Sequence, residues 1–336
     1  MTVMSLAQML DKAIDIHRKN LKSIAIFKLI YSLVTVGIIL GSAIAVTIIV
    51  YLGSLAFFNT SSATLIAFGI TFIVILSIIF VIFVSSVVAL DSVGIMKFTR
   101  NGLEDKTILS GYVLSFVFKN ILKVTGIIAA GVLLFLPIAA VWVGVGWFFY
   151  RFLSQGILLN IINFNFANSP VLGIIAVCVF TLLIICSIMW YMTIHIFSIH
   201  AVVFQNTTFF KALSESRRLV KRNFWKILGY NILFSLCVTA IYYSFSSFVV
   251  IVGGLILLIL KFFNINKDTI VFLQTFWLMA SWPLSVLQQF FVAPLYMLSI
   301  SLLYFNQRFK KDGYDLELRL EKIKLSSIER KMPSGS

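Results

Sequence analysis

The side chains best suited to chemistry in this chain are three histidines and three cysteines. His195 and His200 lie five residues apart, so on an α-helix they diverge by about 140° and do not converge on one ligand. The cysteines lie in apolar stretches and form no Cys-x-x-Cys pair. These patterns indicate neither a zinc site nor a disulfide framework, and we expect no metal and no cofactor.

Sequence motifs for common reaction types are missing too. The chain has no phosphate-binding P-loop, no Gly-x-Ser-x-Gly turn and no His-Glu-x-x-His pair. A membrane-embedded enzyme would still need a nucleophile and a base that converge, and the sequence offers no such pair. We therefore predict that the chain is not an enzyme.

One apolar stretch carries an unusual group of polar residues. Gln288 and Gln289 lie between Pro283 and Pro294. Because a proline removes a backbone donor and frees a carbonyl one turn earlier, a helix broken here would expose polar backbone beside two amides. These four residues are a candidate intramembrane polar site. Weaker candidates to face the same cavity are Pro137, Tyr242, Tyr243, Ser244, Ser246 and Ser247. The alternative is that the prolines only kink a helix and the amides bond it to its neighbours.

Composition decides which elements position these groups. Of 336 residues, 60% are hydrophobic and 12% are charged, against about 25% charged in soluble domains. Residues 29–90 contain no charge, although about 20 helical residues suffice to cross a bilayer. The pattern predicts an all-α, polytopic integral membrane protein with about six transmembrane helices. The expected spans are 29–52, 64–90, 124–150, 171–198, 227–252 and 277–305, with a turn at Asn59–Ser62 and an interfacial stretch before residue 171.

The charges predict how these spans are threaded. Six spans place both termini and two internal loops on one side, and that side then holds 24 of the 27 basic residues. Since Lys and Arg near span ends stay in the cytoplasm, we expect both termini to be cytoplasmic, in a bacterial-type plasma membrane. The expected domains are an N-terminal cytoplasmic amphipathic helix (1–28), a membrane domain (29–307) and a basic cytoplasmic tail (308–336).

Three amphipathic segments precede outward spans. They are expected near residues 5–23, 107–123 and 208–225, and the first has capping-box spacing at Ser5 and Gln8. Each ends in a similar basic-Asn sequence, which suggests a three-fold repeat of amphipathic helix plus two spans. The alternative is that basic-Asn sequences are simply common at inner boundaries. The candidate lipid- or partner-binding basic face consists of Lys211, Arg217, Arg218, Lys221, Arg222, Lys226, Arg308, Lys310 and Lys311.

Two segments resemble a known family. They are residues 216–225 (SRRLVKRNFW), and residues 302–304 (LLY) followed by Arg308 and by residues 313–318 (GYDLEL). Both are similar to the membrane domain of the glycerophosphoryl diester phosphodiesterase membrane-domain family. The resemblance implies about six helices with cytoplasmic amphipathic segments. It carries over no hydrolase activity, because only about 30 residues follow the last span and a catalytic barrel needs about 200 or more. Family members tend to have an acidic residue where this chain has Phe-Asn-Gln at 305–307.

Three functional hypotheses follow. The first is a non-enzymatic accessory or scaffold module that binds anionic lipid, another membrane protein or a second copy of itself through its basic cytoplasmic face. The second is a transporter or permease-like protein with a cavity at the proline-broken sixth span. The third is an immunity or tolerance protein against membrane-active peptides. Nucleic-acid binding is not expected, because the basic residues are accounted for by membrane topology.

Overall fold

The computed structural model describes residues 4–57, 62–154, 170–263 and 267–313. Regular structure in these ranges is α-helical throughout. Six of the helices are long and apolar enough to cross a membrane, which confirms an all-α, multi-pass architecture. Where each span enters and leaves the lipid stays a prediction. Most of the expected turn at Asn59–Ser62, the interfacial stretch 155–169 and the tail from residue 314 lie outside the described residues.

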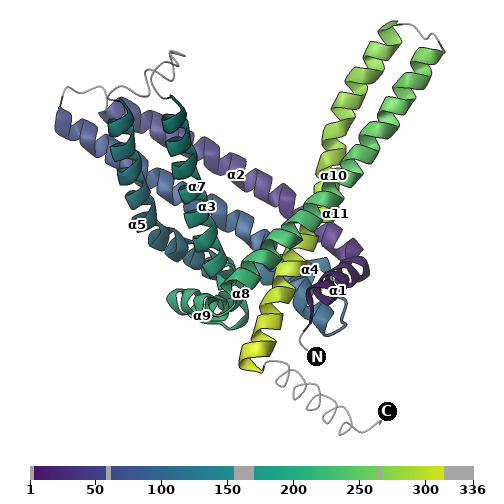
Figure 1. Cartoon of the computed structure of the whole chain (residues 1–336), viewed down its shortest axis with the longest axis horizontal. Helices are drawn as coiled ribbons and strands as arrows, with labels where there is room; N and C mark the ends of the chain where they lie inside the picture. Colours follow the sequence, from purple (N-terminus) through teal and green to yellow (C-terminus); the bar gives the residue numbers. More distant parts are fainter. Residues whose placement is uncertain (1–3, 58–61, 155–169, 264–266, 314–336) are drawn as a thin grey trace. The chain divides into compact units, whose positions relative to one another are not determined.

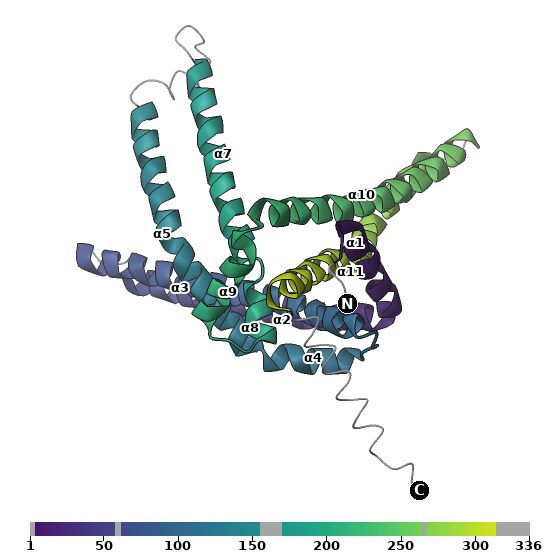
Figure 2. The same ribbon diagram turned by 60° about the horizontal axis from the view of Figure 1, so that its bottom comes forward.

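The chain divides into two compact units, residues 1–121 with 225–336, and residues 122–224. Within the first unit, α2 lies beside α3, and α10 beside α11; within the second, α5 lies beside α7 (Figures 1 and 2). The helices of the first unit are α1 (Leu6–Lys19), α2 (Leu21–Phe57), α3 (Ala63–Leu103), α4 (Ser110–Lys119), α10 (Phe224–Phe262) and α11 (Lys267–Asp312). Those of the second are α5 (Ile121–Ser154), α7 (Pro170–His195), α8 (Ser198–Phe204) and α9 (Phe209–Lys221).

The core of the first unit lies where α1 packs against α2, α3 and the end of α11. Phe27, Phe98 and Tyr304 are fully buried there. Gly94 of α3 allows this packing, because a Cβ at Gly94 would collide with the Phe27 ring. The sixth candidate span, Phe290–Asp312, is accordingly 67% buried over its most apolar window. The end of α11 is thus a core element as well as part of a span.

The rest of the spanning helices is open. Leu33 of α2 is 69% exposed and Val143 of α5 is 72% exposed. In the first span the most apolar window contains no buried residue. Apolar surface on this scale is unfavourable in water and favourable in hydrocarbon, so lipid is the solvent that these arms require.

An asparagine marks each corner between an amphipathic helix and the span that follows it. Asn20 ends α1 and donates its side-chain Nδ2–H to the Ile16 carbonyl at 3.1 Å; Asn120 ends α4 and donates in the same way to Phe116 at 2.8 Å. At the third corner, Asn223 donates its backbone N–H to Val220 at 2.8 Å. These bonds satisfy carbonyls that a helix end leaves without partners.

The amphipathic helices differ in their bounds from the sequence expectation. The capping box predicted for α1 is present, with Gln8 N–H donating to Ser5 Oγ at 3.4 Å and Ser5 N–H donating to Gln8 Oε1 at 2.8 Å. The second amphipathic helix begins at Ser110 rather than at 107, and the third ends at Lys221, before Trp225.

The expected break in the sixth span was wrong. α11 is one continuous helix of 46 residues that includes Pro283 and Pro294. A proline costs a spanning helix one backbone hydrogen bond, and small local adjustments let the helix continue. α11 ends instead after Asp312, where Gly313 adopts φ 62°, a conformation that glycine reaches without strain.

Candidate functional site

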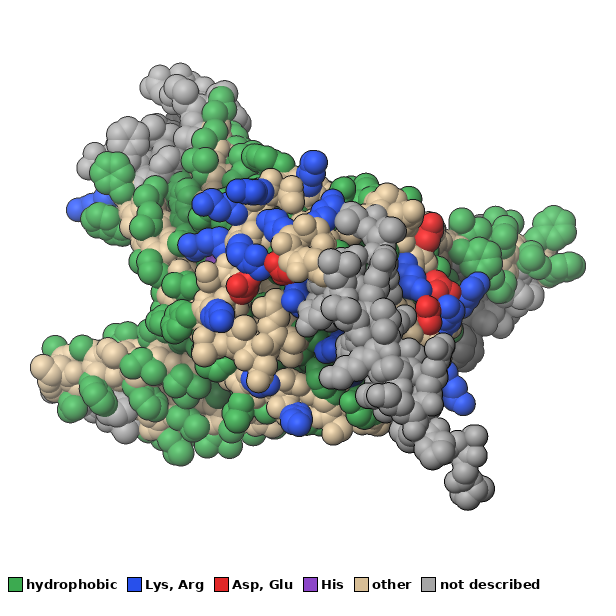
Figure 3. Space-filling model, turned by 90° about the horizontal axis from the view of Figure 1, so that it is seen from below, with side chains coloured by type: hydrophobic (Ala, Val, Ile, Leu, Met, Phe, Trp, Pro, Cys, Tyr) green, Lys and Arg blue, Asp and Glu red, His purple; other side chains and the backbone are tan. Residues whose placement is uncertain are grey.

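The most distinctive surface is one side of α9. Its other side is fully packed, and the buried residues there are Ala212, Leu213, Ser216, Leu219 and Val220. Around an α-helix these positions cover about 120°. Five basic residues cover an arc of about 140° on the opposite side. They are Lys211, Arg217, Arg218, Lys221 and Arg222, all exposed, and we call them the basic arc. Figure 3 shows lysine and arginine side chains clustered over α9.

Ser216 fixes the orientation of the basic arc. The chain turns between α7 and α8, which leaves the Ile194 carbonyl and the Phe197 N–H without helical partners. Ser216 Oγ donates to the Ile194 carbonyl at 2.7 Å and accepts from Phe197 N–H at 3.1 Å. The Ser216 side chain is fully buried. Its two hydrogen bonds therefore hold α9 against the end of α7. Sequence reasoning placed Ser216 in a family motif but found no role for it.

Exposed aromatic groups accompany the basic residues. Phe210 lies within the basic arc and is 61% exposed. Trp225, just beyond the corner, is 79% exposed. Aromatic side chains beside Lys and Arg are typical of a helix that lies in the membrane interface.

The basic residues of α1 are in a different situation. Asp15 forms ion pairs with Lys19 at 3.0 Å, Arg18 at 3.6 Å and Lys12 at 3.7 Å. Lys12 also reaches Asp105 at 3.0 Å. The hydrogen bond from Lys19 and the positive charges around it hold the pKa of Asp15 below its ordinary value. The cations of α1 therefore serve internal pairing. In the basic arc, the ion pair found among the described residues is that of Arg218 with Glu215, at 2.8 Å.

The remaining predicted basic residues lie in the first unit. Arg308 pairs with Asp312 at 3.4 Å, while Lys310 and Lys226 are exposed and Lys311 is half-buried. Arg308, Lys310 and Lys311 belong to the C-terminal end of α11, and Lys226 to the first turn of α10.

The last part of α11 also carries the buried Asn306, which makes two hydrogen bonds to the backbone of one residue, Met4. Asn306 Nδ2 donates to the Met4 carbonyl at 2.9 Å, and Oδ1 accepts from Met4 N–H at 2.9 Å. An acidic residue at position 306 could not provide both bonds, because an ionised carboxylate only accepts.

A largely buried ion pair at the base of the α2–α3 hairpin was not found from the sequence. Lys28 of α2 and Asp91 of α3 form a salt bridge, and their side chains are only 12% and 25% exposed. The two residues flank the charge-free run 29–90. Their positions are symmetric about the predicted turn at Asn59–Ser62, and in an antiparallel hairpin that symmetry brings them face to face. The signal was therefore present in the sequence.

Each of the other two hairpins has a polar tie at a similar level. Tyr296 Oη donates to Asn231 Oδ1 at 2.6 Å between α11 and α10. Tyr191 Oη donates to the Gly131 carbonyl between α7 and α5. Lys28 and Asn231 both lie eight residues beyond a corner asparagine, about 12 Å along the helix, and Gly131 lies eleven beyond.

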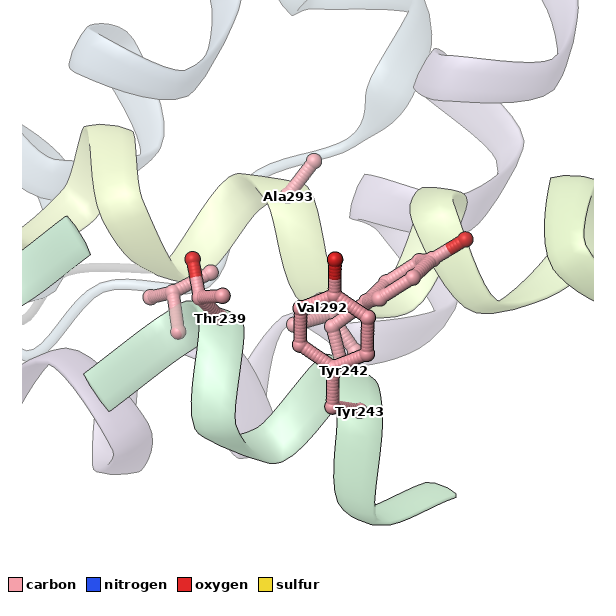
Figure 4. A pocket seen from close by; sticks show the side chains of 6 residues that line it. Thr239, Tyr242, Tyr243, Val292 and Ala293 are labelled. Carbon is pink, nitrogen blue, oxygen red and sulfur yellow. The ribbon is translucent and has the colours of Figure 1, made fainter. Parts of the chain in front are cut away.

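A pocket of about 370 Å³ lies between α10 and α11 (Figure 4). Its lining consists of Val238, Thr239, Tyr242, Tyr243, Val292 and Ala293. The tyrosines expected to be weak contributors to an intramembrane site are therefore placed together. Of the stronger candidates, Pro294 is buried one residue beyond Ala293. Gln288, Gln289 and Pro283 belong to the same helix, and their side chains lie outside the described part of the structure.

The histidines show no sign of joint action. His17 lies on α1, and burial lowers its pKa. His195 ends α7 and contacts Tyr191, with ring centres 4.6 Å apart and ring planes tilted by 58°, while His200 is buried in α8. Across the described ranges, no group of three or more His, Cys, Asp or Glu residues is arranged to hold a metal ion.

Comparison with known proteins agrees with the sequence motifs. No curated protein and no solved structure matches the chain. The matching family model describes a membrane domain and not a catalytic one. Both motif segments, 216–225 and 302–318, lie within the matched residues. Nearly half of the chain, residues 172–332, is therefore similar to the membrane domain of glycerophosphoryl diester phosphodiesterase.

Proposed function

We propose that this protein is a non-enzymatic membrane module that binds anionic lipid headgroups at the cytoplasmic face of a bacterial-type plasma membrane. The observation that carries the proposal is the basic arc of α9. Five exposed cations surround an exposed Phe210 on a helix whose other side is packed. Each basic residue near an anionic leaflet contributes roughly 1 kcal/mol of attraction. Insertion of the Phe210 ring into the membrane interface would add apolar contact.

Three features support α9 rather than α1 as the lipid-binding helix. The cations of α1 are paired with Asp15 and Asp105, so lipid phosphates would have to compete with carboxylates. The basic arc includes Arg218 as its one member with a described carboxylate partner. The Ser216 bonds also hold α9 in place before any lipid arrives, which lowers the entropy lost on binding.

The proposal includes a topology and an internal repeat. All three amphipathic helices lie on the cytoplasmic side, together with both termini, as the distribution of Lys and Arg favours. Each repeat consists of an amphipathic helix, a corner asparagine, an outward helix and an inward helix. The corner bonds of Asn20 and Asn120 and the polar tie of each hairpin support this repeat. Its axis would be parallel to the membrane normal.

The test measures lipid retention by the full-length protein. The chain is placed in nanodiscs of mixed phosphatidylglycerol and phosphatidylcholine, and the lipids retained after detergent extraction are quantified by headgroup. The triple variant Lys211→Glu, Arg218→Glu and Arg222→Glu should lower phosphatidylglycerol retention on the order of 100-fold, since three favourable charges are lost. High salt should weaken retention by the unaltered protein.

A charge-conserving triple variant is the matched control. Lys211→Arg, Arg218→Lys and Arg222→Lys keep the charge of the basic arc and should keep phosphatidylglycerol retention close to that of the unaltered chain. Equal retention by the charge-reversed and charge-conserving proteins would show that the basic arc does not select anionic lipid.

A further inference from the structure

The pocket between α10 and α11 shares no residue with the basic arc, and its lining belongs to the first unit. Thr239 is at the middle of the expected span 227–252, and Val292 is close to the middle of the expected span 277–305. Because α10 and α11 are antiparallel, the lining residues of both helices are expected at a similar depth in the bilayer. Ligands at that depth arrive through lipid rather than through water.

The chemistry of the pocket lining is polar but uncharged. Thr239, Tyr242 and Tyr243 each carry a hydroxyl group, and the other three lining residues are aliphatic. Figure 4 shows these side chains gathered between the two helices. A hydroxyl can donate and accept hydrogen bonds. A site with no charged lining residue cannot compensate the desolvation of a phosphate or an ammonium group, so it favours a neutral ligand.

A hydrogen bond fixes the register of α10 and α11 beside the pocket. The Tyr296–Asn231 bond joins the two helices on the corner side of the pocket. The register set by this bond brings residues 288 and 289 of α11 level with residues 239 and 238 of α10. The two glutamines that the sequence singled out therefore occupy backbone positions at the level of the hydroxyl groups.

We propose that this pocket binds a neutral lipid of the diacylglycerol class. Such a lipid has one hydroxyl and two ester carbonyls, which match donors and acceptors of the pocket lining. Its small uncharged headgroup can enter the hydrocarbon region at far lower cost than a phospholipid headgroup. A volume of about 370 Å³ accommodates the glycerol backbone and the first carbons of the chains, within the usual range for ligand sites of about 300–1,000 Å³.

The test is photolabelling of the full-length protein in phosphatidylcholine nanodiscs. A trace of diacylglycerol carrying a photoreactive group on one acyl chain is added, and labelled peptides are identified by mass spectrometry. The expected label is on the segments around residues 238–243 and 292–293, and excess unlabelled diacylglycerol should displace it. Ala293→Phe fills the pocket and should reduce labelling at least about 10-fold, as for a site that no longer admits its ligand.

Hydroxyl deletions keep the test specific if the larger side chain disturbs the helix. Tyr242→Phe and Thr239→Val should each reduce labelling by roughly 3- to 10-fold, which corresponds to the loss of one hydrogen bond. Ser244→Ala removes a hydroxyl from a residue of α10 outside the lining and should change nothing. Label that added phosphatidylcholine displaces as well as diacylglycerol does would overturn the proposal, because it would show only bulk acyl-chain contact. The basic arc is unaltered in every variant, so this outcome leaves the lipid-retention result unaffected.

Discussion

The packed end of the α2–α3 hairpin and its open arm both contain glycines, but the surroundings of these glycines differ. At the inner end, Gly94 lies against Phe27, and Tyr31 Oη donates to the Val87 carbonyl. Near the middle of α2, Gly37 and Gly41 have open space around the position of a Cβ. The difference shows that contacts within the protein stabilise the packed end of the hairpin, whereas the arm is surrounded mainly by lipid. Substitutions should therefore change stability at the inner end and have little effect along the arms.

The largest effect is expected at the Lys28–Asp91 ion pair. Lys28→Met leaves Asp91 as an unpaired, mostly buried charge, and removing one partner of a buried pair costs about 3–5 kcal/mol. The partial exposure of Asp91 places the expected loss at the lower end of this range. Unfolding in mixed micelles of mild and denaturing detergent measures it. The double variant Lys28→Met with Asp91→Leu should recover most of the stability, and a double variant as unstable as the single one would contradict the pairing.

A pair of glycine substitutions compares the packed end of the hairpin with its open arm. Gly94→Val should destabilise by about 1–3 kcal/mol, because the added side chain cannot fit beside Phe27. Gly41→Val, on the same hairpin, meets no neighbour within 4 Å and should be neutral or slightly stabilising, since glycine is a poor helix former. The same detergent unfolding curve applies to both variants. Similar losses at the two positions would remove the distinction between core and arm.

The bond between α11 and the start of the chain should contribute an intermediate amount. Asn306→Leu leaves the N–H and the carbonyl of Met4 without their partner, at a cost of about 2 kcal/mol. Asn306→Asp should be at least as harmful at neutral pH, because a buried carboxylate cannot donate to the Met4 carbonyl. If Asn306→Asp were as stable as the unaltered protein, the amide bonds would have no structural role.

The smallest effect should come from pH. Burial lowers the pKa of His17 in the folded state below its ordinary value of 6.5, so the unfolded chain binds a proton more readily. Stability should be constant above pH 6.5 and should decline as the pH falls below it. His17→Gln should flatten this decline at the inner end. An identical pH profile in the variant would show that His17 does not contribute.

The sequence predicted the elements better than their contacts. Charge-free runs and the Ser5–Gln8 spacing depend on neighbouring residues, so the spanning helices and the start of α1 could be inferred. The Lys28–Asp91 pair could also have been found from its symmetry about the turn. The Asn306–Met4 bond joins residues 302 positions apart, and no local pattern encodes such a contact. The sequence left open whether the prolines break α11 or only kink it, because a proline breaks a helix only when its surroundings do not restore the helix.

Part of the candidate site was predictable in the same sense. The basic arc follows from helical spacing, because Lys211, Arg218 and Arg222 recur at intervals of seven and four residues. The orientation of the basic arc could not be predicted from helical spacing. It depends on hydrogen bonds from Ser216 to the turn between α7 and α8, and these groups meet only in the folded chain. The pocket required two helices in register, so single residues such as Tyr242 gave only a weak indication.

Cysteine labelling tests the central claim, that the cationic connections share one face of the membrane. In a chain with Cys178, Cys186 and Cys237 replaced by serine, single cysteines are introduced at exposed positions and treated with a membrane-impermeant maleimide from either side of oriented membranes. Ser214→Cys, Lys106→Cys and Lys310→Cys should react only from the cytoplasmic side, and Arg151→Cys only from the opposite side. Reaction of Ser214→Cys from the same side as Arg151→Cys would contradict the proposed threading and the lipid-binding role of α9.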